Sequence, residues 1–191
     1  MRRLIVPIAL ACLVGAAPAT AGSQTVSIAS FSFTPSSLVV NQGVTVTFTN
    51  TANLSHTATS DTGFFNTGTI TAGSSSTATF PSAGSFPYHC QIHPVMHGLI
   101  QVPVTLSTTG SVPKGTKITI RFASETVDGR TYDVQRRIGA GQWVTVASGL
   151  SGTSKKLTLK KKGHYAFRAE VSLAGAVSGW SPAAKIRVTA A

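Results

Sequence analysis

Acidic side chains are scarce in this 191-residue sequence, which has only 5 Asp and Glu and a charged content of 11%. An average soluble domain is roughly 25% charged. Asp61 is the only carboxylate between residues 22 and 110, so this region lacks the carboxylate pair that acid–base hydrolysis uses, and no nucleophile-and-base pair is apparent. We therefore do not expect an enzyme. The hydrophobic content of 42% excludes a disordered chain.

Cysteine is the second shortage, because only Cys12 and Cys90 are present. Cys12 lies in a segment with a basic start, an apolar run over residues 4–14 and small residues up to Ala21, which is the pattern of a secretory signal. A bilayer span needs roughly 20 apolar residues, and neither this run nor any later one is that long. We therefore predict a signal peptide over residues 1–21, a periplasmic or extracellular location, and no transmembrane segment in the mature chain. Cys90 would then be a lone cysteine in an oxidising compartment, either buried and inert or bound to a metal.

The mature sequence also lacks the apolar spacing of an amphipathic helix. It consists instead of short runs rich in Val, Ile, Phe and Thr. Residues 44–48 alternate apolar and polar side chains, which indicates a strand with one buried face. The expected strands are Thr25–Ala29, Leu38–Val40, Val44–Asn50, Ser76–Phe80, Ser85–Cys90, Leu99–Leu106, Lys117–Phe122, Thr131–Ile138, Trp143–Val146, Lys155–Leu159, His164–Val171 and Lys185–Thr189. They predict an all-β fold of sandwiches or barrels. A linker over residues 107–114 would separate a domain of residues 22–106 from one of residues 115–191.

Potential metal ligands gather over residues 88–98, and one more histidine, His56, stands far earlier in the chain. Cys90, His93 and Met96 are separated by two residues each, so one tight loop after a strand can present all three to one point. A thiolate, two imidazoles and a weak axial thioether are the ligands of a blue-copper electron-transfer site. A single Cys, His or Met more often has a structural role, but the four together favour copper.

Several motifs stand in order along the first domain: Phe31-Ser32-Phe33-Thr34-Pro35, Asn41-Gln42-Gly43, His56-Thr57-Ala58-Thr59, Phe65-Asn66-Thr67-Gly68 and the segment from Tyr88 to Met96. With them the domain resembles a cupredoxin of the plastocyanin and amicyanin type, and its short Cys-to-Met loop is more like that of amicyanin. The resemblance implies a Greek-key β-sandwich with one type 1 copper, held by His56, Cys90, His93 and Met96. Many relatives have Asn after the first ligand His, where this chain has Thr57. That difference concerns a hydrogen bond near the thiolate, and with it the redox potential.

The resemblance implies a one-electron carrier. His93, beside Pro94 and Val95, would place its ring edge in an apolar patch on which a redox partner docks briefly, while His56 would be the more buried ligand. Two alternatives stay open: copper storage or delivery, in which the metal is cargo, and an envelope adhesion or scaffold protein with an accessory copper site.

Two further histidines lie next to the proposed ligands. Adjacent side chains on a strand point to opposite faces, so His89 is expected to face away from the site that Cys90 enters. In copper nitrite reductases a histidine at this place serves a second copper, but here only His97 and His164 would remain to complete such a site. We expect no second copper, and we expect His97 to be an exposed loop residue, with competition for the axial copper position as the alternative.

Nearly all of the charge belongs to the second domain, because 14 of the 16 Lys and Arg and 4 of the 5 acidic residues lie in residues 111–191. This domain resembles a fibronectin type III module, with Tyr165 placed as a tyrosine corner. The segments that carry the resemblance are Tyr132–Arg137, His164–Ala169 and Ser178–Pro182. Its basic runs, Lys155-Lys156, Lys160-Lys161-Lys162 and Arg136-Arg137, are either a solvated face or a surface for an anionic envelope polymer, a lipid surface or an acidic partner. Export makes nucleic acid a poor candidate.

Overall fold

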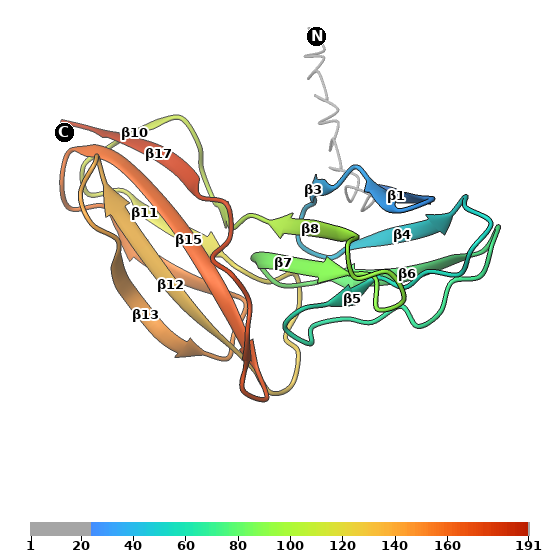
Figure 1. Ribbon diagram of the computed structural model, residues 1–191. Helices are drawn as coiled ribbons and strands as arrows, with labels where there is room; N and C mark the ends of the chain where they lie inside the picture. Colours follow the sequence, from blue (N-terminus) through green and yellow to red (C-terminus); the bar gives the residue numbers. More distant parts are fainter. Residues whose placement is uncertain (1–23, 191) are drawn as a thin grey trace, which may run out of the picture.

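The computed structural model describes residues 24–190, so the predicted signal peptide lies outside the described residues. Within that range every regular element is a β-strand, which confirms the all-β fold. The same residues contain no helix with the length and apolarity to cross a membrane. The strands form two sandwiches that follow one another along the chain (Figure 1).

The N-terminal sandwich has two four-stranded sheets, with strand orders β2-β1-β4-β6 and β3-β8-β7-β5. Its strands are β1 (Gln24–Ala29), β2 (Ser32–Thr34), β3 (Ser37–Val39), β4 (Val44–Asn50), β5 (Thr59–Ser60), β6 (Ser75–Phe80), β7 (Gly84–His89) and β8 (His97–Val102). Alternate residues of β4 are buried, as the sequence pattern predicts. From this face Phe48 packs edge-on against Tyr88 of the opposite sheet, and Phe33 does the same. The aromatic core between the sheets therefore lies directly beneath the end of β7, where the predicted ligand loop begins.

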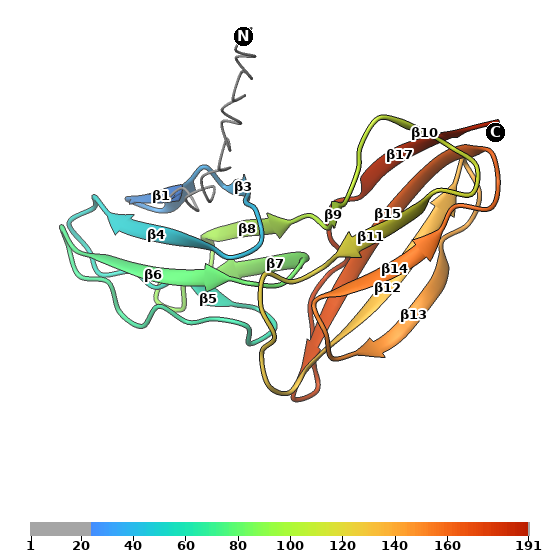
Figure 2. The ribbon, with the colours of Figure 1, turned by 180° about the vertical axis from the view of Figure 1, so that it is seen from behind.

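The C-terminal sandwich packs a larger sheet, β10-β17-β15-β12-β13 with β16 beside β15, against a three-stranded sheet, β14-β11-β9 (Figure 2). Its strands are β9 (Thr105–Leu106), β10 (Ser111–Pro113), β11 (Lys117–Arg121), β12 (Arg130–Ile138), β13 (Val144–Leu150), β14 (Ser154–Thr158), β15 (Gly163–Leu173), β16 (Ala176–Val177) and β17 (Ala184–Thr189). The Tyr165 hydroxyl donates to Lys161 O at 2.9 Å and accepts from Lys161 N at 3.0 Å. These are the contacts of a tyrosine corner, which fastens the start of β15 to the loop before it.

The segment that connects the sandwiches is itself folded into the C-terminal sheets. Thr105 and Leu106, at the end of the first predicted domain, pair with β11. Ser111–Pro113, inside the predicted linker, pairs in parallel with β17. Short strands at both ends thus hold the connection against the C-terminal sandwich.

A buried, hydrogen-bonded junction joins the two sandwiches. The hydroxyl of Ser82, a fully buried residue, lies 2.8 Å from Tyr132 Oη and accepts a 2.8 Å hydrogen bond from Arg130. Ser85 and Gly179 exchange two main-chain hydrogen bonds of 2.8 Å each. The buried apolar residues of both sandwiches belong to one continuous cluster. The described chain is therefore one packed body, in which the C-terminal sandwich has a fixed position relative to the N-terminal one.

Gly98 permits the close approach of Tyr88, its partner across β7 and β8. A Cβ at residue 98 would overlap the ring and hydroxyl atoms of the buried Tyr88. We expect Gly98→Ala to lower the free energy of unfolding by about 2–3 kcal/mol, because overpacking a rigid core forces side chains off their rotamers. Denaturant unfolding measures this change. Gly152→Ala is the control, since a Cβ there meets nothing within 4 Å, and a loss of similar size in the control would contradict the steric explanation.

Candidate metal centre

The loop after β7 carries three of the four predicted ligands. β7 ends at His89 and β8 begins at His97, so residues 90–96 form the turn between them. Cys90 N donates to Met96 O at 3.1 Å, and Met96 N donates to His93 O at 3.0 Å. These hydrogen bonds close the loop and fix the main chains of Cys90, His93 and Met96 relative to one another.

His56 reaches the same place from the segment between β4 and β5. Its main chain exchanges two hydrogen bonds with Ile70, of 3.0 and 2.7 Å. The buried Asn50 amide donates to Leu54 O at 2.7 Å and to Ile70 O at 2.8 Å, which ties this segment to the end of β4. The His56 side chain is fully buried and that of His93 is half-buried, in agreement with the expected difference between the two histidines.

Three donor atoms converge where these segments meet. Nδ1 of His56 and Nδ1 of His93 are 3.1 Å apart, and Cys90 Sγ lies 3.7 Å from the first and 3.8 Å from the second. Among the His, Cys, Asp and Glu residues between 24 and 190, these three form the only such convergent group. A thiolate and two imidazole nitrogens that face one point are the arrangement that one metal ion can bind together.

The environment of His56 favours the ligand form of its ring. Burial lowers the pKa of His56 below its ordinary value, and the neighbouring His93 lowers it further. A neutral imidazole keeps a lone pair for a metal, whereas a protonated one does not. The ring is thus held ready to bind a cation.

The N-terminal part of the chain matches a known protein family. The sequence profile of the cupredoxin-like domain matches residues 3–102. The chain belongs to the cupredoxin-like domain family. Among solved structures it is similar to a reduced, Cu(I) form of an amicyanin variant, at 28% identity, with 44% of this chain and 86% of that chain covered and a TM-score of 0.41. It is also similar to a purple cupredoxin from Nitrosopumilus maritimus, at 25% identity, with 41% and 98% covered and a TM-score of 0.39. No curated protein matches the chain.

Copper is the cofactor of a cupredoxin, and the donor set of this chain fits it. Two imidazoles and a thiolate in a trigonal arrangement, with a distant thioether, suit copper. The observed separations of Cys90 Sγ from the two histidine nitrogens are 3.7 and 3.8 Å. Met96, the predicted axial residue, has a buried side chain that is 1% exposed.

Thr57, the residue after His56, contacts the thiol through its main chain. Thr57 N donates to Cys90 Sγ at 3.3 Å. Its hydroxyl accepts from Gln91 N at 2.8 Å and from the Thr59 hydroxyl at 3.3 Å. Hydrogen bonds of this kind orient metal ligands and tune the metal. The sequence singled out Thr57 as a departure, but the support that its hydroxyl gives to the ligand loop is visible only in the structure.

The other two histidines lie outside the cluster. His89 faces away from Cys90, as expected, and its Nδ1 lies 2.6 Å from Asp61 Oδ1. His97 is exposed, as expected, but it is the first residue of β8 rather than a loop residue. Neither ring belongs to the convergent group of ligand atoms.

Apolar side chains are exposed on the loops around the site. Val95 is 77% exposed and Ile92, on the same loop, 47%. Phe31, in the turn between β1 and β2, is 57% exposed and meets the His93 ring edge-on, with centroids 5.1 Å apart. No spacing in the sequence connects Phe31 with the ligand loop, so its contact with His93 could not be predicted.

Proposed function

We propose that this cupredoxin is a secreted one-electron carrier whose type 1 copper is held by His56, Cys90, His93 and Met96. The observation that carries the proposal is the triangle of two Nδ1 atoms and one Sγ, with sides of 3.1, 3.7 and 3.8 Å. When bound, copper supplies a Cu(I)/Cu(II) couple that takes one electron from a donor and gives one electron to an acceptor. The signal peptide over residues 1–21 would export the chain to a periplasm or out of the cell.

The support around the ligands favours electron transfer over copper storage or delivery. The loop of residues 90–96 is closed by main-chain hydrogen bonds, and the Thr57 hydroxyl fastens it to the His56 segment. Donors that are locked by their surroundings keep one geometry, so little rearrangement accompanies a change of oxidation state. A site for cargo must instead open to release the metal, and the buried side chains of His56, Cys90 and Met96 oppose opening.

The copper-loaded mature protein tests the proposal. We expect one copper per chain, an intense blue colour in the oxidised form, and reversible loss and return of this colour on reduction and reoxidation. A colourless Cu(II) complex of the folded protein would contradict the thiolate ligand. Rapid release of Cu(I) to an acceptor, without electron exchange, would favour delivery instead.

We further propose that the redox partner docks on the apolar surface around His93, formed by Phe31, Ile92 and Val95. Small, weakly polar interfaces suit the short encounters of electron-transfer proteins. The N-terminal sandwich has almost no charge with which to recognise a partner, since Asp61 is its only charged residue apart from histidines. Apolar contact beside the half-buried ring of His93 is therefore the main attraction that this face can offer.

Val95→Glu is expected to slow electron transfer from a protein donor by roughly tenfold, because a charge in a small apolar interface must be desolvated when the partner docks. Stopped-flow mixing with a protein donor, and separately with a small-molecule reductant, measures this effect. The small-molecule rate should stay close to that of the unaltered protein. Val144→Glu is the matched control, because Val144 is 50% exposed on β13 of the other sandwich. Equal slowing by both substitutions would place the docking surface elsewhere.

For the chain as a whole we propose a copper domain over residues 22–106, a connection over residues 107–114 and a fibronectin type III-like module over residues 115–191. The hydrogen bonds between Tyr165 and Lys161 support the second assignment. The basic surface of this module would hold the copper domain near an anionic polymer or surface of the cell envelope.

A further inference from the structure

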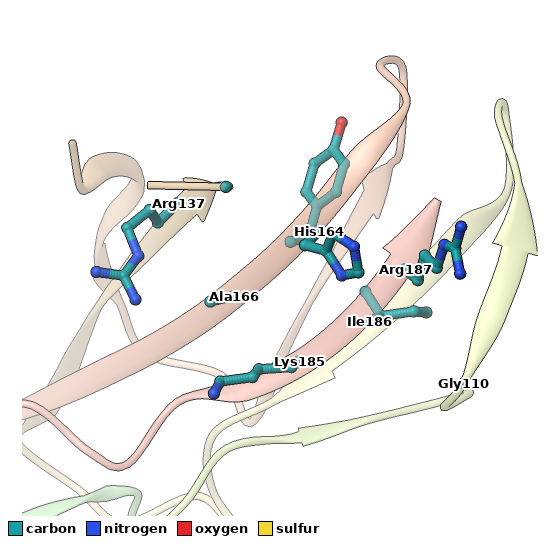
Figure 3. A pocket seen from close by; sticks show the side chains of 9 residues that line it. Gly110, Arg137, His164, Ala166, Lys185, Ile186 and Arg187 are labelled. Atoms are coloured by element: carbon teal, nitrogen blue, oxygen red, sulfur yellow. The ribbon is translucent and has the colours of Figure 1, made fainter. Parts of the chain in front are cut away.

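A groove crosses the outer face of the larger C-terminal sheet, and basic side chains surround it (Figure 3). Residues that lie directly opposite one another on paired strands project from the same face of a sheet. Arg137 of β12, Ala166 of β15 and Lys185 of β17 form one such row across three strands. His164 and Arg187 form the next row. The groove has a volume of about 590 Å³.

Small residues leave room between these cations. Ala166 occupies the middle of the first row, where a longer side chain would fill the space between Arg137 and Lys185. Gly139 and Gly110 line the groove beside the second row. The pattern of strands and small residues therefore produces a hollow whose walls are long cationic side chains.

The four basic side chains have no hydrogen-bond or ion-pair partner among the described residues. Arg137, His164, Lys185 and Arg187 make no side-chain hydrogen bond within residues 24–190 and no ion pair there, and no carboxylate lines the groove. The nearest acidic row on this face, Asp133 with Glu170, is four residues away along the strands, or about 13 Å. One of these carboxylates is already engaged, because Asp133 accepts a hydrogen bond from Gly149 N.

Stacking on the Trp143 ring holds the Arg137 side chain in place. Its guanidinium carbon lies 4.7 Å from the centre of the Trp143 ring, against which Arg168 also packs at 4.2 Å. Arg168 is anchored in turn by two hydrogen bonds to Gln135 Oε1, of 3.0 and 2.7 Å. Stacking on an aromatic ring fixes the plane of a guanidinium and leaves its N–H edges available to an anion.

We propose that this groove binds phosphoryl groups. A carboxylate has two oxygens and is matched by a single arginine fork, whereas three cationic side chains and a histidine, from three strands, suit a group with three acceptor oxygens and about two negative charges. The groove spans both rows of residues, so it can accommodate more than one linked phosphoryl group. The inference rests on the anionic envelope partner proposed above. It specifies the chemical class of that partner and the part of the C-terminal sandwich that binds it.

Calorimetric titration of the intact, copper-loaded protein with tripolyphosphate, at fixed ionic strength, tests the proposal. We expect saturable binding with one ligand per chain. The double variant Lys185→Ala/Arg187→Ala should weaken binding by at least about tenfold, because it removes two charged hydrogen-bond donors. The double variant Lys117→Ala/Lys156→Ala is the matched control: it removes the same charge from exposed positions of β11 and β14, in the other sheet, and should change affinity by less than about twofold.

Ala166→Val tests the shape of the groove without any change of charge, and it should also weaken tripolyphosphate binding. Inorganic phosphate is the second ligand to be titrated: affinity equal to that of tripolyphosphate identifies free phosphate as the ligand, and weaker affinity identifies linked phosphoryl groups. If both double variants weaken tripolyphosphate binding equally, or if binding does not saturate, the proposal of a specific site is wrong and the attraction depends only on overall charge. The blue absorption of each variant reports the copper site independently, so failure of the groove is distinguishable from failure of the redox proposal.

Discussion

Replacing Cys90 with serine is expected to abolish the blue colour and to lower the rate of electron exchange by at least about a hundredfold, since even the loss of a group that merely supports a metal ligand costs 10- to 100-fold. The reason lies in the donor set. Cys90 Sγ is the one sulfur in the triangle with His56 and His93, and the thiolate gives blue copper its covalent link to the protein. Visible and electron paramagnetic resonance spectra of the Cu(II) forms, together with voltammetry, measure the loss.

The variant is expected to fold. Serine is close to cysteine in size, and its hydroxyl can accept the hydrogen bond that Thr57 N donates to Sγ. Circular dichroism of the metal-free proteins checks this expectation. His89→Asn is the control, because His89 directly precedes Cys90 but contacts Asp61 on the opposite face of β7, and this variant should remain blue. A blue Cys90→Ser variant, or a colourless His89→Asn variant, would show that the ligands are assigned wrongly.

The sequence predicts the parts of the site that depend on local spacing. Cys90, His93 and Met96 are separated by two residues each, and one closed turn does place their main chains together. His56 was a candidate because the donor set needs a second imidazole, but nothing in the spacing indicates that a residue 34 positions earlier is 3.7 Å from the thiol, and the family resemblance supplied that link. Phe31 could not be found at all, since its contact with His93 arises from the packing of a turn against a loop.

The strands could be predicted because they depend on local sequence signals. The junction was missed because it depends on contacts between residues far apart in the sequence. The alternation in β4 and the turn residues between runs are local signals, so the all-β fold followed from them. The pairing of Ser111–Pro113 with β17 joins residues more than 70 positions apart. A stretch rich in Ser, Thr, Gly and Pro has the composition of a linker, and composition does not reveal that such a stretch adds a strand to a distant sheet.

The junction between the sandwiches leads to a second large expected effect: removal of copper should destabilise the sandwich that does not bind it. A ligand that binds only the folded state stabilises it by about 4 kcal/mol at a thousand times its dissociation constant, or roughly 10 °C in melting temperature for a chain of this size. Both tryptophans, Trp143 and Trp180, lie in the C-terminal sandwich. Trp143 fluorescence therefore follows that sandwich, Trp180 also responds to the junction because its carbonyl accepts a hydrogen bond from Ser85 Oγ, and the blue absorption follows the copper site.

We expect the two signals to change at the same temperature in the copper-loaded protein, and the fluorescence transition to fall by about 10 °C when copper is removed. Gly179→Val should separate the transitions, because a side chain there meets Ser85 Cβ at 3.0 Å and disturbs the paired main-chain hydrogen bonds between the sandwiches. Gly152→Val, in open space on the same sandwich, should not separate them. If removal of copper leaves the temperature of the fluorescence transition unchanged in the unaltered protein, the sandwiches unfold independently in spite of their shared core. If the transitions coincide, copper binding stabilises the C-terminal sandwich through the junction. The groove on the outer face of that sandwich then keeps a fixed position relative to His93.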